Sequence, residues 1–309
     1  MRLSRRSLLS WAAAGALTPA FAGTSVTVRD SLGEHTFAAH PKRPVVLQWD
    51  ILENIVGLGI TPVGAADIEP WSAWVVDPAL PSGIVSVGTR AEPNLERIAA
   101  LKPDVILAGP TQTDLLPALQ AVAPVLMFEN WRKDASENEA ETAFRQLNEQ
   151  ARLFGREERA REIREETEKA FARLKEKIEA HFGFLPEVQV IRLSSLTTCF
   201  LYTENSITDF AVRALGLRQA IVKPAENYGL VQVRLRELKH LTDTCVIYAR
   251  PFALETKLMQ SVLWRALPFT RRGRVAPAAP YWSHGGALSV RVTAERITEA
   301  LLTMPGRKV

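Results

Sequence analysis

The sequence predicts an α/β protein of two lobes with mostly parallel sheets, joined by one long rigid helix. Short apolar runs alternate with helical stretches from Thr24 to about Leu126, and the alternation restarts after Pro186. This rhythm is typical of parallel sheets covered by helices. Between the two regions, residues 135–182 are charged and contain no proline. The chain has 309 residues, of which 47% are apolar, so its length suggests about two domains.

The first 22 residues have the pattern of a secretory signal peptide. A basic start is followed by an apolar stretch over residues 8–17 and by an A-x-A cleavage motif that ends at Ala22. The apolar stretch is well short of the ~20 residues that a membrane-spanning helix needs. The adjacent Arg5 and Arg6 are typical of the twin-arginine export route. We therefore expect a mature protein in the periplasm, with the signal cleaved near Ala22.

The charge of the chain argues against a nucleic-acid partner. The formal net charge is +4, and three of the positive charges, Arg2, Arg5 and Arg6, belong to the signal peptide. The mature chain therefore carries only about +1, which is too little to indicate a nucleic-acid-binding surface. We expect a monomer that binds no nucleic acid.

An amino-terminal α/β lobe is expected over residues 23–155. Asp50 is predicted to cap the first helix at its start, and Pro93 and Pro103 mark the two ends of a later helix. The expected strands are residues 43–49, 61–67, 104–109 and 124–129, and the expected helices are residues 50–60, 92–103 and 113–123.

A linking helix is expected over residues 156–183, after a break at Gly155. One face of this segment carries less polar residues at helical spacing: Ile163, Thr167, Ala170, Phe171, Leu174 and Ile178. About 26 residues at 1.5 Å each give a helix of roughly 39 Å. We expect an amphipathic helix with one solvated face, which limits the lobes to a small rocking motion.

A second α/β lobe is expected over residues 184–309. Its expected strands are residues 187–194, 199–203 and 243–250, and its expected helices are residues 206–217, 234–242, 261–272 and 293–304. Cys199 and Cys245 lie in two of these apolar strands. In an oxidising compartment a disulfide and a pair of buried thiols are both open.

The segments "RPVVLQWDILENIVGLGITPVGAAD", "VGTRAEPNLERIAALKPDVILAG" and "SVLWRALPFTRRGRV" resemble the periplasmic siderophore-binding proteins of iron ABC importers. The resemblance is closest to ferric-hydroxamate-binding members, and it is strongest over residues 45–105 and 264–289. It implies two lobes joined by a backbone helix, a ferric siderophore bound in the shallow cleft between them, and no catalysis. It also implies no intrinsic cofactor, because the ferric iron is held within the siderophore.

The resemblance assigns Arg90 to contact the iron-bound oxygens of the ligand. Ferric siderophore oxygens carry negative charge, and a guanidinium offers several fixed donors that do not deprotonate. The same likeness places Trp74, Trp282 and Tyr228 in the cleft, where stiff aromatic side chains suit a bulky, partly apolar ligand. Core packing is the alternative for each aromatic residue. Weaker candidates, by proximity alone, are Trp71, Tyr281 and Trp131.

Two departures from the family pattern affect the predicted ligand. The loop "PTQTD" has no aromatic residue where a relative has a contacting tyrosine, and His284 replaces a second tyrosine. We expect His284 to become cationic at mildly acidic pH. Arg90 and a cationic His284 would suit a carboxylate-rich or mixed citrate-hydroxamate siderophore, and we expect a ligand that contains hydroxamate or citrate and hydroxamate together.

The resemblance also implies an inner-membrane ABC permease dimer, with its ATPase, as the partner. An acidic residue on each lobe docks onto arginines of such a permease. Asp114 occupies this place in the first lobe. In the second lobe the register gives Arg234, with Glu237 nearby as the substitute.

Other functions find less support in the residues. The chain has no G-x-S-x-G elbow, no P-loop, and no close pair of histidines among its five, which argues against a periplasmic enzyme and against a dedicated site for a bare metal ion. Haem or a corrinoid is the more serious alternative, since these ligands also favour aromatic and cationic side chains.

Overall fold

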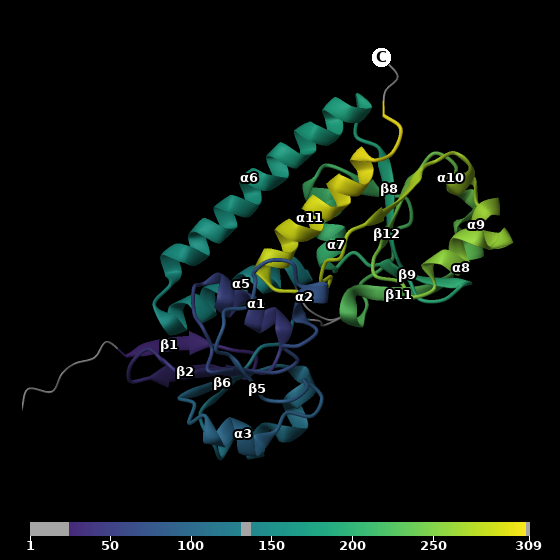
Figure 1. Cartoon of the computed structure of the whole chain (residues 1–309). Helices are drawn as coiled ribbons and strands as arrows, with labels where there is room; N and C mark the ends of the chain where they lie inside the picture. Colours follow the sequence, from purple (N-terminus) through teal and green to yellow (C-terminus); the bar gives the residue numbers. More distant parts are fainter. Residues whose placement is uncertain (1–24, 131–136, 307–309) are drawn as a thin grey trace, which may run out of the picture.

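The computed structural model describes residues 25–130 and 137–306. The predicted signal peptide and Trp131 lie outside the described residues. The expected architecture is confirmed: two α/β lobes lie at the two ends of the molecule, and the long helix α6 (Glu157–Phe182) runs along one side (Figure 1). The predicted domain boundaries remain predictions, because one apolar core includes Leu58 of the first lobe, α5 (Glu139–Phe154), α6 and the second lobe.

The first lobe contains a five-stranded, entirely parallel sheet with the strand order β5-β4-β3-β6-β7. Its central strands β3 and β6 are buried along their whole length, as expected for a sheet covered on both faces. The strands are β3 (Pro44–Val46), β4 (Gly64–Ala65), β5 (Val85–Ser86), β6 (Val105–Ala108) and β7 (Val125–Met127). The helices are α1 (Trp49–Gly57), α2 (Trp71–Trp74), α3 (Leu95–Ala100), η1 (Pro110–Leu115) and α4 (Leu116–Gln120). A separate antiparallel hairpin precedes them, β1 (Val26–Arg29) and β2 (Glu34–Phe37).

The start of α1 differs from the prediction. Gln48, not Asp50, is the residue before the helix, and Asp50 lies buried in the first turn. The helix begins earlier because Trp49 is buried, with 2% of its surface exposed, and its indole N–H donates to the backbone oxygen of Asp67 at 3.1 Å. The packing of this tryptophan overrides the local capping preference of Asp50.

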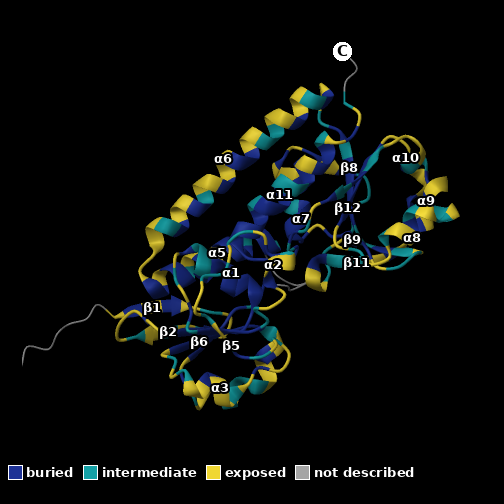
Figure 2. Cartoon of the chain, viewed as in Figure 1, coloured by how far each residue is buried: buried dark blue, intermediate teal, exposed yellow. Residues whose placement is uncertain are grey.

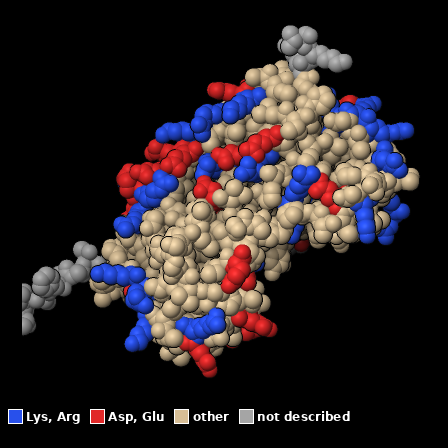
Figure 3. Space-filling view, viewed as in Figure 1, with Lys and Arg blue, Asp and Glu red and all other residues tan. Residues whose placement is uncertain are grey.

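The long helix follows the predicted pattern. It is separated from α5 by Gly155, which has a positive φ of 64°, and it ends before Gly183, with a φ of 78°. The expected inner face is buried except for Leu174, which is partly buried. The outer face is exposed and carries alternating charges (Figures 2 and 3), including the pairs Arg159–Glu166 at 2.8 Å and Arg164–Glu168 at 3.0 Å.

The second lobe contains a mixed six-stranded sheet. The strand order is β11-β9-β8-β12-β13, and β10 pairs with the start of β8. Strands β8, β10, β12 and β13 run parallel to one another. Strands β9 and β11 run antiparallel to their neighbours. The strands are β8 (Glu187–Leu193), β9 (Thr198–Tyr202), β10 (Arg218–Gln219), β11 (Leu230–Arg234), β12 (Cys245–Ala249) and β13 (Val275–Ala278). The helices are α7 (Ile207–Ala214), η2 (Asn227–Gly229), η3 (Leu235–His240), α8 (Glu255–Gln260), α9 (Val262–Ala266), α10 (Pro268–Arg271) and α11 (Ala287–Leu302).

The two cysteines are free and buried. Cys199 packs into the core on one face of the second sheet, and Cys245 packs into the core on the other. Burial raises the pKa of both thiols. The open question from the sequence is answered in favour of two separate thiols.

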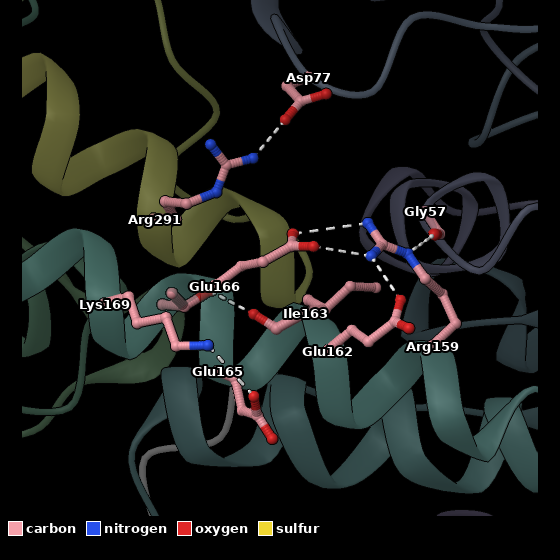
Figure 4. A network of polar contacts seen from close by, with 10 residues as sticks. Gly57, Asp77, Arg159, Glu162, Ile163, Glu165, Glu166, Lys169 and Arg291 are labelled. Atoms are coloured by element: carbon pink, nitrogen blue, oxygen red, sulfur yellow. Dashed lines mark hydrogen bonds and ion pairs between the residues drawn. The ribbon is translucent and has the colours of Figure 1, made fainter.

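Polar contacts join the first lobe to α6 and α11 on the side of the molecule that carries the long helix (Figure 4). Arg159 of α6 donates from Nε to the backbone oxygen of Gly57 at the end of α1, at 3.4 Å. Arg291 of α11 forms an ion pair with Asp77, in the loop after α2. These contacts, together with the shared core, hold the lobes in one arrangement.

Candidate functional site

Residues that follow four parallel strands of the first lobe meet at one edge of its sheet. Gln48 follows β3, Asp67 follows β4, Arg90 follows β5 and Thr111 follows β6. The chain runs outward from β3 to β5 and then returns to β6 on the other side of β3, so the strand order reverses between β3 and β6. The carboxyl ends of strands at such a reversal form the usual ligand crevice of an open α/β sheet. All four residues line one cavity.

The guanidinium of Arg90 is held on one edge. Its Nε donates to Oδ2 of Asp67 at 2.7 Å, and its backbone N–H donates to the same oxygen at 3.1 Å. Its Cζ lies 4.2 Å from the ring centroid of Trp49 and 5.5 Å from that of Trp282, a cation–π arrangement. Within the described residues, its two terminal nitrogens make no hydrogen bond, so these N–H groups remain available to a ligand.

Four tryptophans pack edge to face beside Arg90. The ring centroids are 5.6 Å apart for Trp71 and Trp49, 4.9 Å for Trp49 and Trp282, and 5.8 Å for Trp282 and Trp74. Trp282 lines the cavity, whereas Trp74 is not a lining residue and is linked to the cavity through its contact with Trp282. Trp71 is buried and donates its indole N–H to the backbone oxygen of Pro78 at 3.1 Å. The aromatic cluster gives the cavity a stiff apolar side.

The second lobe contributes Tyr228, Trp282 and His284 to the same cavity. Tyr228 is 58% exposed and has a positive φ of 61°, just before β11. Trp282 and His284 follow β13, and their rings are 5.8 Å apart. Tyr281, a weaker candidate, is buried in the core of the second lobe.

The expectation that His284 becomes cationic at mildly acidic pH is wrong. Burial lowers the pKa of His284 to about 4, and the positive charges of Arg192 and Arg90 lower it further. The imidazole is therefore neutral throughout the range in which we expected it to gain a proton.

The cavity has a volume of about 330 Å³ and opens to solvent between the lobes, which is within the usual range of ligand sites. It brings together Arg90, Tyr228, Trp282 and His284 of the predicted ligand residues. The other contributors were not predicted from the sequence. They are Gln48, Asp67, Thr89, Ala91 and Thr111, which line the cavity, and Trp49, which lies behind Arg90. Asp67 ends a predicted strand, and that position was the available signal.

The two predicted docking residues lie outside the cavity, on different lobes. Asp114 is exposed in η1, just after the cavity residue Thr111. Glu237 is exposed in η3, where its carboxylate accepts the backbone N–H of Arg234 at 3.0 Å. This contact gives Glu237 a local role in capping η3, and its docking role stays a prediction.

The segment that carries Trp282 and His284 is fastened to the first lobe. Glu53 of α1 accepts hydrogen bonds from the backbone N–H and the hydroxyl of Ser289, at 2.5 and 2.6 Å, and Asn54 accepts the backbone N–H of Ala287 at 2.9 Å. Burial raises the pKa of Glu53 to about 8, although the bonds from Ser289 oppose the shift. Gly286 permits this approach, because a Cβ there would lie 2.5 Å from the backbone oxygen of Asp50.

Within residues 25–130 and 137–306, no group of three or more His, Cys, Asp or Glu side chains is placed to hold a metal ion. In the same ranges, no helix has the length and apolar character needed to cross a bilayer.

Comparison with known proteins agrees with this geometry. A family model for periplasmic binding proteins matches residues 45–278. The siderophore-binding protein FhuD from Vibrio cholerae, solved with Fe³⁺-Desferal bound, has a TM-score of 0.83 and 46% sequence identity, covering 86% of this chain and 100% of that one. The iron(3+)-hydroxamate-binding protein FhuD of Escherichia coli (strain K12) is 26% identical over 258 residues, 82% of this chain and 85% of its own. The Fe(3+) dicitrate-binding periplasmic protein FecB of the same strain is 27% identical over 277 residues, 82% of this chain and 81% of its own.

The matched residues include β3 to β13 and so span both sides of the cavity. The resemblance inferred from the sequence is confirmed, and the family is one of binding proteins. The chain belongs to the periplasmic binding protein family.

Proposed function

We propose that this protein captures a ferric siderophore whose iron is held by hydroxamate groups, and delivers it to an inner-membrane ABC importer. The observation that carries the proposal is the cavity that Arg90 lines together with Trp282, Tyr228 and His284, where the terminal nitrogens of Arg90 make no hydrogen bond within the described residues. The relative from Vibrio cholerae, at 46% identity, was solved with Fe³⁺-Desferal, a trihydroxamate complex.

The chemistry of the cavity fits such a complex. Hydroxamate oxygens bound to Fe³⁺ keep partial negative charge and accept hydrogen bonds from a guanidinium. The linkers between hydroxamates are largely apolar and suit the indole of Trp282 and the ring of Tyr228. The neutral His284 removes the reason for expecting a citrate-containing ligand, so hydroxamate is the class that we favour.

Location and partners follow from the same proposal. The mature protein lies in the periplasm after cleavage near Ala22, and it docks on a permease dimer with its ATPase through Asp114 and Glu237. No cofactor belongs to the protein itself, because the iron arrives and leaves within its ligand. The exposed positions of both docking residues support this role.

The test is a titration of the mature protein with the trihydroxamate complex ferrioxamine B, followed by quenching of tryptophan fluorescence. Wild type should show saturable quenching, because four tryptophans lie within one or two ring contacts of Arg90. Arg90→Gln and Arg90→Ala should weaken binding by about tenfold or more, the usual cost of losing a charged hydrogen bond. Arg97→Ala, on the exposed helix α3, is the control and should bind as wild type does.

Haem and cobalamin complete the panel. Binding of haem with a Soret shift, and no response to ferrioxamine B, would contradict the proposal. Equal affinity of wild type and both Arg90 variants for ferrioxamine B would contradict the role of Arg90.

A further inference from the structure

The described residues that line the cavity carry balanced charge. They include one cation, Arg90, and one carboxylate, Asp67. His284 also lines the cavity, and its imidazole is neutral at pH 7 because burial lowers its pKa to about 4. Two ionisable groups outside the lining interact with it. Arg192 helps to lower the pKa of His284, and Asp50 interacts with Arg90 but is only partly charged at neutral pH, because burial raises its pKa to about 7.

The ion pair of Arg90 and Asp67 is built into the fold. The Asp67 carboxylate binds both the side chain and the backbone N–H of Arg90, and its side chain is only 18% exposed. The backbone of Asp67 is fixed as well, since its N–H donates to Gly88 at 2.9 Å and its oxygen accepts the indole N–H of Trp49 at 3.1 Å. Asp67 has a φ of 52°, a conformation that Asp and Asn adopt more readily than most residues.

We infer that Asp67 sets the charge preference of this site: its carboxylate cancels the charge of Arg90, so the cavity favours ferric complexes with an uncharged iron centre over polyanionic ones. The inference rests on the proposed function and names a specificity residue within that same site. In its contact with Arg90, Asp67 acts as a positioning residue.

The physical reason is that Arg90 has two properties, its N–H donors and its positive charge, and Asp67 affects only the second. The terminal N–H groups of Arg90 can still donate hydrogen bonds to the oxygens of an uncharged ferric trihydroxamate. The ion pair removes the net positive charge that would attract ferric citrate or a ferric tricatecholate with a charge of −3. Two opposite charges at hydrogen-bond distance exert little net attraction on an anion, because their Coulomb energies with it nearly cancel. An anion that enters also loses hydration against the indoles, with no net positive charge to offset that loss.

The variant Asp67→Asn tests the charge alone. Asparagine has the same shape, tolerates a positive φ, and keeps an oxygen that can accept the N–H groups of Arg90. Glu96→Gln is the matched control, because Glu96 is exposed in the first turn of α3, in the same lobe and outside the cavity. Circular dichroism and thermal unfolding establish that both variants are folded.

The probes are ferrioxamine B, ferric citrate and a ferric tricatecholate, each titrated into wild type, Asp67→Asn and Glu96→Gln at 20 and 500 mM salt. Wild type should prefer ferrioxamine B. In Asp67→Asn at low salt, the ratio of the dissociation constants for the tricatecholate and ferrioxamine B should fall by about tenfold or more, while the affinity for ferrioxamine B changes by less than about threefold. The change should shrink at high salt, because ions screen a charge effect. Glu96→Gln should keep the wild-type ratio.

An equal loss of affinity for every complex, at both salt concentrations, would overturn the inference and reduce Asp67 to a support for Arg90. An unchanged ratio in Asp67→Asn, with ferrioxamine B still bound, would also overturn it and leave the proposed function intact. Failure of wild type to bind any of the ferric complexes would overturn the proposed function, and this inference with it.

Discussion

The two sides of the cavity differ in how firmly they are held. On the first-lobe side, Arg90 is fixed by Asp67 and stacked on Trp49, which is itself buried. On the second-lobe side, Tyr228 is 58% exposed on a short turn before β11. Trp282 and His284 belong to the second lobe in sequence but are tied to α1 of the first through Glu53 and Asn54. The contrast indicates that most of the site exists before a ligand arrives, and that the Tyr228 turn is the part most able to adjust.

The largest effect should come from Trp282→Ala, which removes the residue that joins the two sides. Trp282 packs on Trp49 and Trp74 and lines the cavity. Loss of this partly buried ring should lower the free energy of unfolding by about 3 kcal/mol and weaken ferrioxamine B binding by more than about tenfold. Urea unfolding and the fluorescence titration measure the two effects. A variant with unchanged stability would show that the tryptophan cluster does not hold the segment in place.

Gly286→Ala should loosen the fastening of the second-lobe segment to the first lobe. The added Cβ would lie 2.4 Å from Oδ1 of Asn54 and 2.5 Å from the backbone oxygen of Asp50, so α1 and α11 would have to move apart. We expect a loss of about 2 kcal/mol in the free energy of unfolding by overpacking. The backbone of Gly286 is extended, with a φ of −84°, which alanine adopts readily, so the loss would come from overpacking and not from backbone strain. An unchanged free energy of unfolding would argue against a tight contact at Gly286.

The same contact should make stability depend on pH. The pKa of Glu53 is raised from 4.5 to about 8 in the folded protein, so the folded state binds more protons than the unfolded state between these values. The free energy of unfolding should therefore fall as pH rises from about 5 to 8, with Glu53 contributing on the order of 3 kcal/mol. Glu53→Gln should flatten the dependence but not abolish it, because burial also raises the pKa of Asp50 and Glu139. Urea unfolding between pH 5 and 8.5 provides the measurement, and parallel profiles for variant and wild type would refute the assignment.

The smallest effect should come from Tyr228→Ala. The side chain is largely exposed, so the free energy of unfolding should change by less than about 0.5 kcal/mol. Binding of ferrioxamine B should weaken by about three- to tenfold, because one aromatic contact is lost. Tyr228→Phe separates the ring from the hydroxyl and should stay within about twofold of wild type. A Tyr228→Ala variant that unfolds more easily than Trp282→Ala would reverse the comparison between the two sides.

Much of the fold could be predicted from the sequence, because it depends on local signals. The long helix is set by apolar residues at helical spacing between Gly155 and Gly183, and those limits are confirmed. The start of α1 was mispredicted, since the packing of Trp49 against a distant segment overrides the capping preference of Asp50.

The site could be predicted only in part. Arg90, Tyr228, Trp282 and His284 were found through their motifs, and the structure brings all four to one cavity. Asp67 was missed because its place at the end of a predicted strand marks only a candidate position, and its role depends on a partner 23 residues away. The pKa of His284 was misjudged for the same reason: burial and two arginines from other segments determine it.

The fastening of Ser289 to Glu53 limits how this protein can be recombined with its relatives. The order of the elements suggests the long helix as the point at which to exchange lobes between two relatives. Such an exchange would combine α1 of one parent with the start of α11 from the other, and so replace only one side of this contact. A chimaera designed to change ligand choice should therefore transplant residues 281–289 together with α1, even though more than 200 residues separate them in the chain. The residues that must be exchanged together to change specificity are those in contact, and these contacts join one lobe to the other.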